Sequence, residues 1–260
     1  MTSIDFGMEL GSIALSASMA VAAGLVGCFA VMRRMTLAAD AISHVALPGI
    51  GIALILHVYP IAGALVMLFL GTVLIWALEI RTKIATETVI GVVFTIALAI
   101  GSFLTSGEEL IDALFGAPGN LTGWEIAFGL IGAAIVIVVI LARKNALVVS
   151  LVSPDIASTS GIDVAILNLT FLLAFALTVA LGIRYLGVLL MGSLIIIPAV
   201  TARRLAANLT AMLSLSVGVA VVSTLVGIYL GAVLQRETGP LIVSTAGGIF
   251  FLSLFRRSVS

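Results

Sequence analysis

An acid and a histidine stand four residues apart in Asp40-Ala41-Ile42-Ser43-His44, inside a stretch that is otherwise apolar enough to span a bilayer. Residues i and i+4 of a helix share one face, so Asp40 and His44 can point at a common centre. A carboxylate in hydrocarbon is costly and is usually kept for a partner charge, an ion or a proton. Carboxylate and imidazole groups are also ligands of transition metals. The pair therefore predicts either a metal site or a structural ion pair between helices.

Pro48 and Gly49 follow the pair and change the backbone beside it. Pro48 has no N–H, so it cannot bond to the carbonyl of His44, four residues earlier. We expect His44 to offer both a ring and an unpaired backbone oxygen at nearly the same depth. Gly49 and Gly51 leave room for close approach by another helix. Two ligands are fewer than a zinc site usually has, and a symmetric dimer would supply four.

The composition places these residues in a membrane protein. Of the 260 residues, 62% are hydrophobic and 9% are charged, and the mean hydropathy is +1.35. Soluble domains carry about 25% charged residues, so the bilayer must act as the solvent. The net charge is zero, and no basic stripe indicates a nucleic acid partner. The one cysteine, Cys28, cannot build a disulfide framework.

Apolar runs predict an all-α polytopic membrane protein with about nine transmembrane helices, forming a single transmembrane domain over residues 1–260. Each run is close to the ~20 residues that cross a bilayer. The predicted spans are Leu10–Met32, Leu37–Val58, Ile61–Leu78, Thr88–Thr105, Gly123–Leu141, Val164–Gly182, Leu186–Ala202, Ala211–Leu234 and Pro240–Phe255. The start of the chain lacks the basic residues of a signal peptide, so we expect the first span to be kept as an anchor.

The basic residues predict the orientation of these spans. With the N-terminus outside, ten of the 12 lysines and arginines fall on the inner side, and only Arg184 and Arg236 fall outside. Positive residues are enriched on the cytoplasmic side, so we expect an outer N-terminus and a cytoplasmic C-terminus. Acidic residues are skewed to the outer side, where they would concentrate cations. Glu79 and Glu87 are instead interpreted as part of a charged boundary at the inner surface.

A short helix is predicted in the inner loop Asn145–Asp163. Ser153 is a good N-cap, Pro154 suits the first helical position, and Asp155 complements the positive helix end. Gly161 can end the helix in the left-handed conformation. A helix of about two turns is too short to cross the membrane. We interpret it as a docking element at the cytoplasmic surface, with a simple connector as the alternative.

Four stretches, in order along nearly the whole chain, match the pattern of one family. They are Arg33-Arg34-Met35 with Asp40–His44 and Leu47-Pro48-Gly49; Thr88–Phe94; Ser153-Pro154-Asp155 with Ala157 and Gly161; and Leu186–Arg204. Together they resemble the permease subunits of bacterial ABC importers for zinc, manganese and iron, the ABC-3 family. One departure is Ala39, which stands where the family often has glycine.

The resemblance implies a type II ABC importer-like fold in the bacterial plasma (inner) membrane, surrounded by lipid. It implies a homodimer of permeases, two separate ABC ATPase subunits beneath, and an extracytoplasmic binding protein that delivers the metal. ATP would bind the partner ATPase, since the chain has no G-x-x-x-x-G-K-[ST] phosphate loop. The chain would then be a transport subunit and not an enzyme, with no covalently bound cofactor.

The resemblance also assigns roles to residues of this chain. It implies that Asp40 and His44 bind the transported ion, and that Pro198 frees the carbonyl of Leu194 and breaks the seventh span. Contact with the ATPase is implied for Pro154, Asp155, Ile156, Ala157 and Gly161. The metal is not specified, because an acid and an imidazole suit zinc, manganese and iron alike.

Two functions of other classes are alternatives. A secondary carrier could exchange metal for protons at Asp40 and His44, and it would take up metal without an ATPase. A membrane-embedded enzyme could use the pair as acid and base. That enzyme would need a nucleophile or further ligands, and Ser43 lies elsewhere on the helix.

Overall fold

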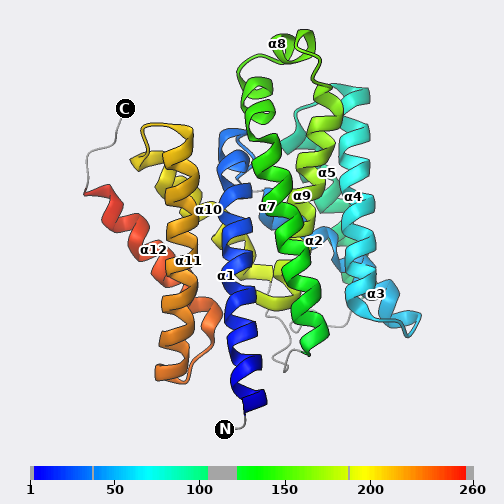
Figure 1. The fold of residues 1–260 in the computed structure, drawn as a ribbon. Coiled ribbons are helices and arrows are strands. Elements are labelled where there is room, and N and C mark those ends of the chain that lie inside the picture. Colours follow the sequence, from blue (N-terminus) through cyan, green and yellow to red (C-terminus); the bar gives the residue numbers. More distant parts are fainter. Residues whose placement is uncertain (1–2, 37, 105–121, 187, 256–260) are drawn as a thin grey trace.

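The structure, a computed structural model, describes residues 3–36, 38–104, 122–186 and 188–255 (Figure 1). Every element in these ranges is a helix. The elements are α1 (Ser3–Met32), α2 (Ala38–Val45), α3 (Leu47–Ile55), α4 (Pro60–Thr82), α5 (Thr86–Leu104), α7 (Gly123–Val152), α8 (Pro154–Thr159), α9 (Val164–Leu186), α10 (Val188–Leu205), α11 (Leu209–Leu234) and α12 (Thr238–Leu254). The predicted all-α class is confirmed for this part of the chain.

Seven segments in the described ranges are long and apolar enough to cross a membrane. They are Leu10–Met32, Ala38–Ile55, Ala62–Thr82, Thr86–Leu104, Gly123–Val152, Val164–Ile183 and Leu209–Leu234. The two remaining predicted spans coincide with α10 and α12, which have 18 and 17 residues. The polytopic membrane class is therefore confirmed, while the count of nine spans and the orientation of the termini remain predictions.

The second predicted span is two helices and not one. α2 ends at Val45, α3 begins at Leu47, and Pro48 is the second residue of α3. Between them the Ala46 N–H donates to the Ser43 carbonyl at 3.3 Å, a tighter turn than the α-helical one. The missing N–H of Pro48 explains why the regular ladder stops here. The interruption lies at Ala46, two residues after His44 and two before the proline.

Pro198 does not break α10, and the prediction of a broken seventh span is wrong. α10 runs from Val188 to Leu205 with Pro198 inside it. One turn further, the Thr201 hydroxyl donates to the Ile197 carbonyl at 2.7 Å, and α10 packs against α1, α11 and α12. Membrane helices tolerate proline where hydroxyls and neighbouring helices support the backbone.

The fifth predicted span ends too early. α7 continues from Gly123 to Val152, so the first part of the predicted inner loop is helical. No glycine or proline interrupts residues 142–152, and the Arg143-Lys144 pair consists of good helix formers. The helix stops where the backbone preceding Pro154 becomes extended at Ser153.

α1 is the central helix of the bundle. It packs against α7, α9, α10 and α11, and Figure 1 shows it between α7 and α11. At Gly27 the helix approaches α10 so closely that a Cβ atom would overlap the carbonyl oxygen of Ile195. Such small-residue contacts drive helix association in lipid. The helices α2 to α5 form a neighbouring group, which α9 and α10 join to the centre.

Candidate functional site

α2 positions Asp40 and His44 on one side of the helix. The helix packs against α4, α5, α9 and α10, and it buries Ala39, Ile42 and Ser43. Asp40 is exposed and His44 is half-buried. The apolar face of α2 therefore anchors the helix, while the acid and the imidazole remain accessible on the opposite face.

A hydrogen bond fixes the orientation of the His44 ring. Its Nδ1 atom lies 2.8 Å from the backbone carbonyl oxygen of Asp40. Because a carbonyl oxygen only accepts, Nδ1 carries the hydrogen and a neutral ring keeps its lone pair on Nε2. In a metal-binding histidine, the ring nitrogen that does not bind the metal commonly donates a hydrogen bond to a backbone carbonyl. The same oxygen also accepts a hydrogen bond from the Ser43 hydroxyl, at 2.6 Å.

The two side chains are not joined to each other. His44 donates to the backbone of Asp40 and not to its carboxylate, and within the described residues neither side chain takes part in an ion pair. The alternative of a structural Asp–His ion pair is therefore not supported by this arrangement. Both groups are available for a ligand.

Asp40 and His44 are the two candidate ligands that one chain places at this point. Across the described ranges there is no group of three or more histidine, cysteine, aspartate or glutamate side chains that could hold a metal. The exposed position of Asp40 leaves space for ligands from another molecule. A metal site at Asp40 and His44 therefore remains a prediction.

Two further residues contact the pair and were not identified from the sequence. The ring of Phe94, in α5, meets the His44 ring edge-on, with centroids 5.4 Å apart and an angle of 76°. Gly192, in α10, lies beside Asp40: an added Cβ would be 3.8 Å from the Asp40 backbone nitrogen. No spacing rule links residues on separate helices, although Phe94 and Gly192 lie in two of the stretches that carry the family resemblance, Thr88–Phe94 and Leu186–Arg204.

The glycines after Pro48 bring α3 against its neighbours, as predicted. A Cβ on Gly49 would overlap the carbonyl oxygen of Gly63 in α4, and a Cβ on Gly63 would overlap that of Gly49. A Cβ on Gly51 would lie 2.6 Å from the Cβ of Leu104 in α5. The second half of the broken span is therefore held by direct backbone contact.

The predicted short helix is present as α8, and its start follows the predicted signals. The Ser153 hydroxyl accepts a hydrogen bond from the Ile156 N–H at 3.3 Å. Pro154 opens the helix and Asp155 lies in its first turn. Figure 1 shows α8 at the end of the molecule opposite the N-terminus.

α8 ends at a left-handed glycine, also as predicted. Gly161 has a φ of +79°. The Ile162 N–H donates to the Ala157 carbonyl at 3.0 Å, and the Gly161 N–H donates to Ser158 at 3.1 Å, the pattern of a Schellman motif. Ala157 is buried, whereas the other residues implied in ATPase contact are exposed: Pro154, Asp155, Ile156 and Gly161.

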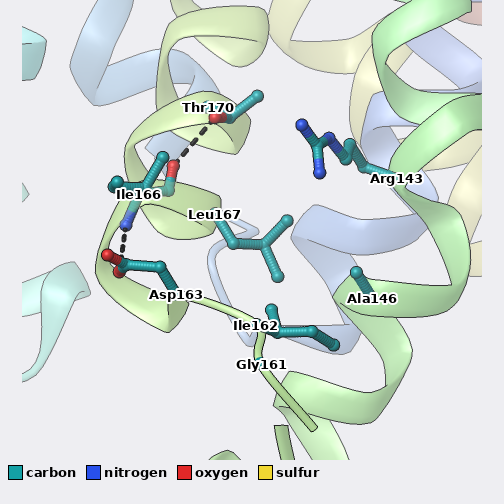
Figure 2. A pocket seen from close by; sticks show the side chains of 8 residues that line it. All are labelled: Arg143, Ala146, Gly161, Ile162, Asp163, Ile166, Leu167 and Thr170. Atoms are coloured by element: carbon teal, nitrogen blue, oxygen red, sulfur yellow. Dashed lines mark hydrogen bonds between the residues drawn. The ribbon is translucent and has the colours of Figure 1, made fainter. Parts of the chain in front are cut away.

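A small cavity of about 160 Å³ lies between α7 and α9 where α8 leads into α9 (Figure 2). It is lined by Arg143, Ala146, Gly161, Ile162, Asp163, Ile166, Leu167 and Thr170. The Asp163 carboxylate accepts a hydrogen bond from the Ile166 N–H at 3.0 Å and so caps the start of α9. The end of α8 and the first turn of α9 are thus built as one continuous unit.

The family model described as the ABC 3 transport family matches residues 8–257. The chain belongs to the ABC 3 transport family. The resemblance carried by the four stretches is confirmed, and the seven candidate spans agree with a multi-pass membrane permease.

Relatives within this family include two transport proteins. The high-affinity zinc uptake system membrane protein ZnuB of Haemophilus influenzae is 31% identical over 239 residues, which are 89% of this chain and 91% of ZnuB. The manganese import system permease protein ScaB of Streptococcus parasanguinis is 31% identical over 214 residues, which are 80% of this chain and 75% of ScaB. The solved structure of PsaBC from Streptococcus pneumoniae in complex with Fab has a TM-score of 0.81 and 26% identity, and covers 96% of this chain and 92% of that one.

Proposed function

We propose that this ABC 3 family member is the permease subunit of an ATP-driven importer for a divalent transition metal, zinc or manganese. The observation that carries the proposal is the orientation of His44. Its Nδ1 atom is used by the Asp40 backbone, which leaves Nε2 for a ligand beside an exposed carboxylate. Relatives named for zinc and manganese uptake support this class of ion.

The ion would bind Asp40 and His44 transiently on its way through the membrane. In a homodimer two copies would supply two carboxylates and two imidazoles, a suitable set for a tetrahedral zinc ion. The exposed position of Asp40 supports a second copy as the source of the missing ligands. Transport requires that the site also releases the ion, so weak or incomplete coordination suits the function.

α8 would contact the partner ATPase. Its exposed Pro154, Asp155 and Ile156 form the accessible side, while the buried Ala157 holds the helix to the bundle. An extracytoplasmic binding protein would deliver the metal from the other side. ATP-driven closure of two ATPase subunits would then move α8 and alternate the access of the site between the two sides.

The first test measures uptake of zinc(II) and manganese(II), each alone, in cells that lack their own importers and express the permease with its ATPase and binding protein. We expect His44→Gln and Asp40→Asn to lower the uptake rate by about a hundredfold, because each removes a metal ligand. The complex should still assemble, since both residues lie outside the buried face of α2.

Matched controls come from the same chain. His57→Asn changes the only other histidine, which is exposed and ends α3 with a φ of +54°, a conformation that asparagine tolerates. Asp163→Asn keeps the cap on α9. Both controls should transport normally, and normal transport by either site variant would contradict the proposed pathway. Uptake by the permease alone, driven by a pH gradient, would favour a metal–proton carrier.

A further inference from the structure

A second polar cluster joins four segments of the chain away from the Asp40–His44 site. It consists of Arg33, which follows α1; Glu79, near the end of α4; Thr86, the first residue of α5; and Asn168, in the second turn of α9. Side-chain hydrogen bonds connect all four residues. From the sequence Glu79 is interpreted as part of a charged boundary, but it is an acceptor within this cluster.

Asn168 is the centre of the cluster. Its Oδ1 atom accepts a hydrogen bond from Nη1 of Arg33. Its Nδ2 atom donates to both carboxylate oxygens of Glu79, at 2.8 and 2.7 Å. The Thr86 hydroxyl donates to the same carboxylate at 2.8 Å. One amide on α9 is therefore bonded on one side to the segment before α2 and on the other side to α4.

The guanidinium group of Arg33 also packs against α9, on the ring of Phe171. Its guanidinium carbon lies 4.5 Å from the centroid of the Phe171 ring, within the range of a cation–π contact. Burial lowers the pKa of Arg33 to about 10, and the negative charge of Glu79 opposes this shift. Arg33 is therefore still a cation at neutral pH. Its Nε atom is buried with no hydrogen-bond partner, so the guanidinium is placed for Asn168 and Phe171 at the cost of one bond.

The turn that carries Arg33 is hydrogen-bonded to the start of α2. Arg34 has a φ of +60°, and the Met35 N–H donates to the Ala30 carbonyl at 2.8 Å, closing α1. The Ala38 N–H, at the start of α2, in turn donates to the Met35 carbonyl at 3.2 Å. Asp40 lies two residues further along. Hydrogen bonds therefore lead from the turn of Arg33 to the first residue of α2.

The other end of the connection is α8. α9 begins three residues after Gly161, and α8 also packs against α9. Leu167, the neighbour of Asn168, is buried and lines the cavity where α8 meets α9. A displacement of α8 therefore reaches the first turns of α9 directly.

We propose that Asn168 is a positioning residue that couples α8 to the metal pathway, by holding Arg33 and through it the start of α2. This inference rests on the proposed function, in which α8 contacts the ATPase and α2 carries the metal ligands. Asn168 does not touch the metal. It links α8, which the ATPase would move, to α2, which carries the proposed metal ligands.

The test uses the permease–ATPase complex reconstituted in proteoliposomes with its binding protein. Two rates are measured, uptake of manganese(II) or zinc(II) and ATP hydrolysis. We expect Asn168→Leu to lower the number of ions transported per ATP about tenfold, within the range of coupling changes seen on mutation. ATP hydrolysis and metal binding to the complex should remain, because neither the ATPase contact nor the ligands are changed. A ratio equal to that of the unmodified complex would overturn the proposal.

A conservative variant separates coupling from simple structural support. Glu79→Gln keeps an amide oxygen that accepts from Asn168 and leaves the hydrogen bond between Asn168 and Arg33 unchanged. The proposed path runs through Arg33, so this variant should keep its transport per ATP within about twofold. A tenfold loss would show that the path does not run through Arg33. Thr170→Val is the control, because the Thr170 hydroxyl bonds only within α9, to the Ile166 carbonyl.

Arg33→Lys serves if Asn168→Leu does not assemble. Lysine keeps the charge opposite Glu79 but loses the planar donor fork and the contact with Phe171. The same drop in ions per ATP is expected, and an unchanged ratio would reject the proposal. If the unmodified complex transports neither metal, the proposed function itself fails. Transport by the unmodified complex with full coupling in the variants would reject only the role of Asn168.

Discussion

Pro48 and Pro198 lie in two apolar segments of similar composition, yet their helices respond differently. At Pro48 the span divides into α2 and α3, whereas α10 continues through Pro198. Around Pro48, α3 is held separately by the glycine contact with Gly63. Around Pro198, the Thr201 hydroxyl bonds to the backbone one turn earlier, and α1 lies directly against α10 at Gly27.

The difference shows that a proline permits a break but the neighbouring helices decide whether it occurs. In the divided span both halves pack against α4 and α5, and α2 also packs against α9 and α10. Where one continuous surface supports both halves, the lost hydrogen bond is tolerated within the helix. The broken span is the one that carries Asp40 and His44, so the irregular backbone lies at the candidate site.

Among the changes that test this comparison, a larger side chain at the contact between Gly49 and Gly63 should have the largest effect. Gly49→Val places two methyl groups against the Gly63 carbonyl and the Cβ of Met67, and we expect a loss of about 3 kcal/mol or more in stability. The measurement is the thermal unfolding of the purified complex. Gly91→Ala is the matched control, because nothing lies within 4 Å of an added Cβ there. An equal and small effect of both changes would disprove that backbone contact holds α3.

Replacing Pro48 or Pro198 by alanine should change metal uptake to different extents. Pro48→Ala restores an N–H that can bond to His44, so α2 and α3 should merge and the His44 ring should move. We expect metal uptake to fall at least about tenfold, because a displacement of a functional group by about 1 Å can cost that much. Pro198→Ala should transport normally, since α10 is already continuous. Equal uptake by the two variants would contradict the distinction.

The smallest effect is expected from a change at Thr201, which tests how α10 tolerates Pro198. Thr201→Val removes the hydroxyl bond to Ile197 and should cost about 1 kcal/mol in thermal stability. Thr178→Val is the control: Thr178 is also buried and bonds to a carbonyl four residues back, in α9, but no proline lies nearby. We expect the control to lose less. A greater loss in Thr178→Val would mean that the Thr201 hydroxyl gives no special support to the helix beside Pro198.

Local features of the molecule could be predicted from the sequence. The shared face of Asp40 and His44 follows from helical periodicity, and both ends of α8 follow from Ser153, Pro154 and Gly161, whose preferences act within one turn. These signals depend on chemistry between near neighbours in the chain. They therefore need no knowledge of how the helices pack.

Features that depend on packing could not be predicted in this way. Phe94 and Asn168 act on residues from distant parts of the chain, and no periodicity relates them. The error at Pro198 has the same origin, because the local rule for proline takes no account of the helices around it. The predicted end of α7 is too early, because the apolar run stops before Arg143 although arginine is a good helix former.

The exposure of Asp40 has a consequence for how the transporter is made. A lone subunit inserted in the bilayer presents this carboxylate, in the first turn of α2, without a partner, and an acidic group within a membrane span costs free energy. Association with a second copy around a shared ion would relieve that cost. We therefore expect the unassembled subunit to be the less persistent form in the cell, so that the residue that binds the cargo also favours complete assembly over orphan chains.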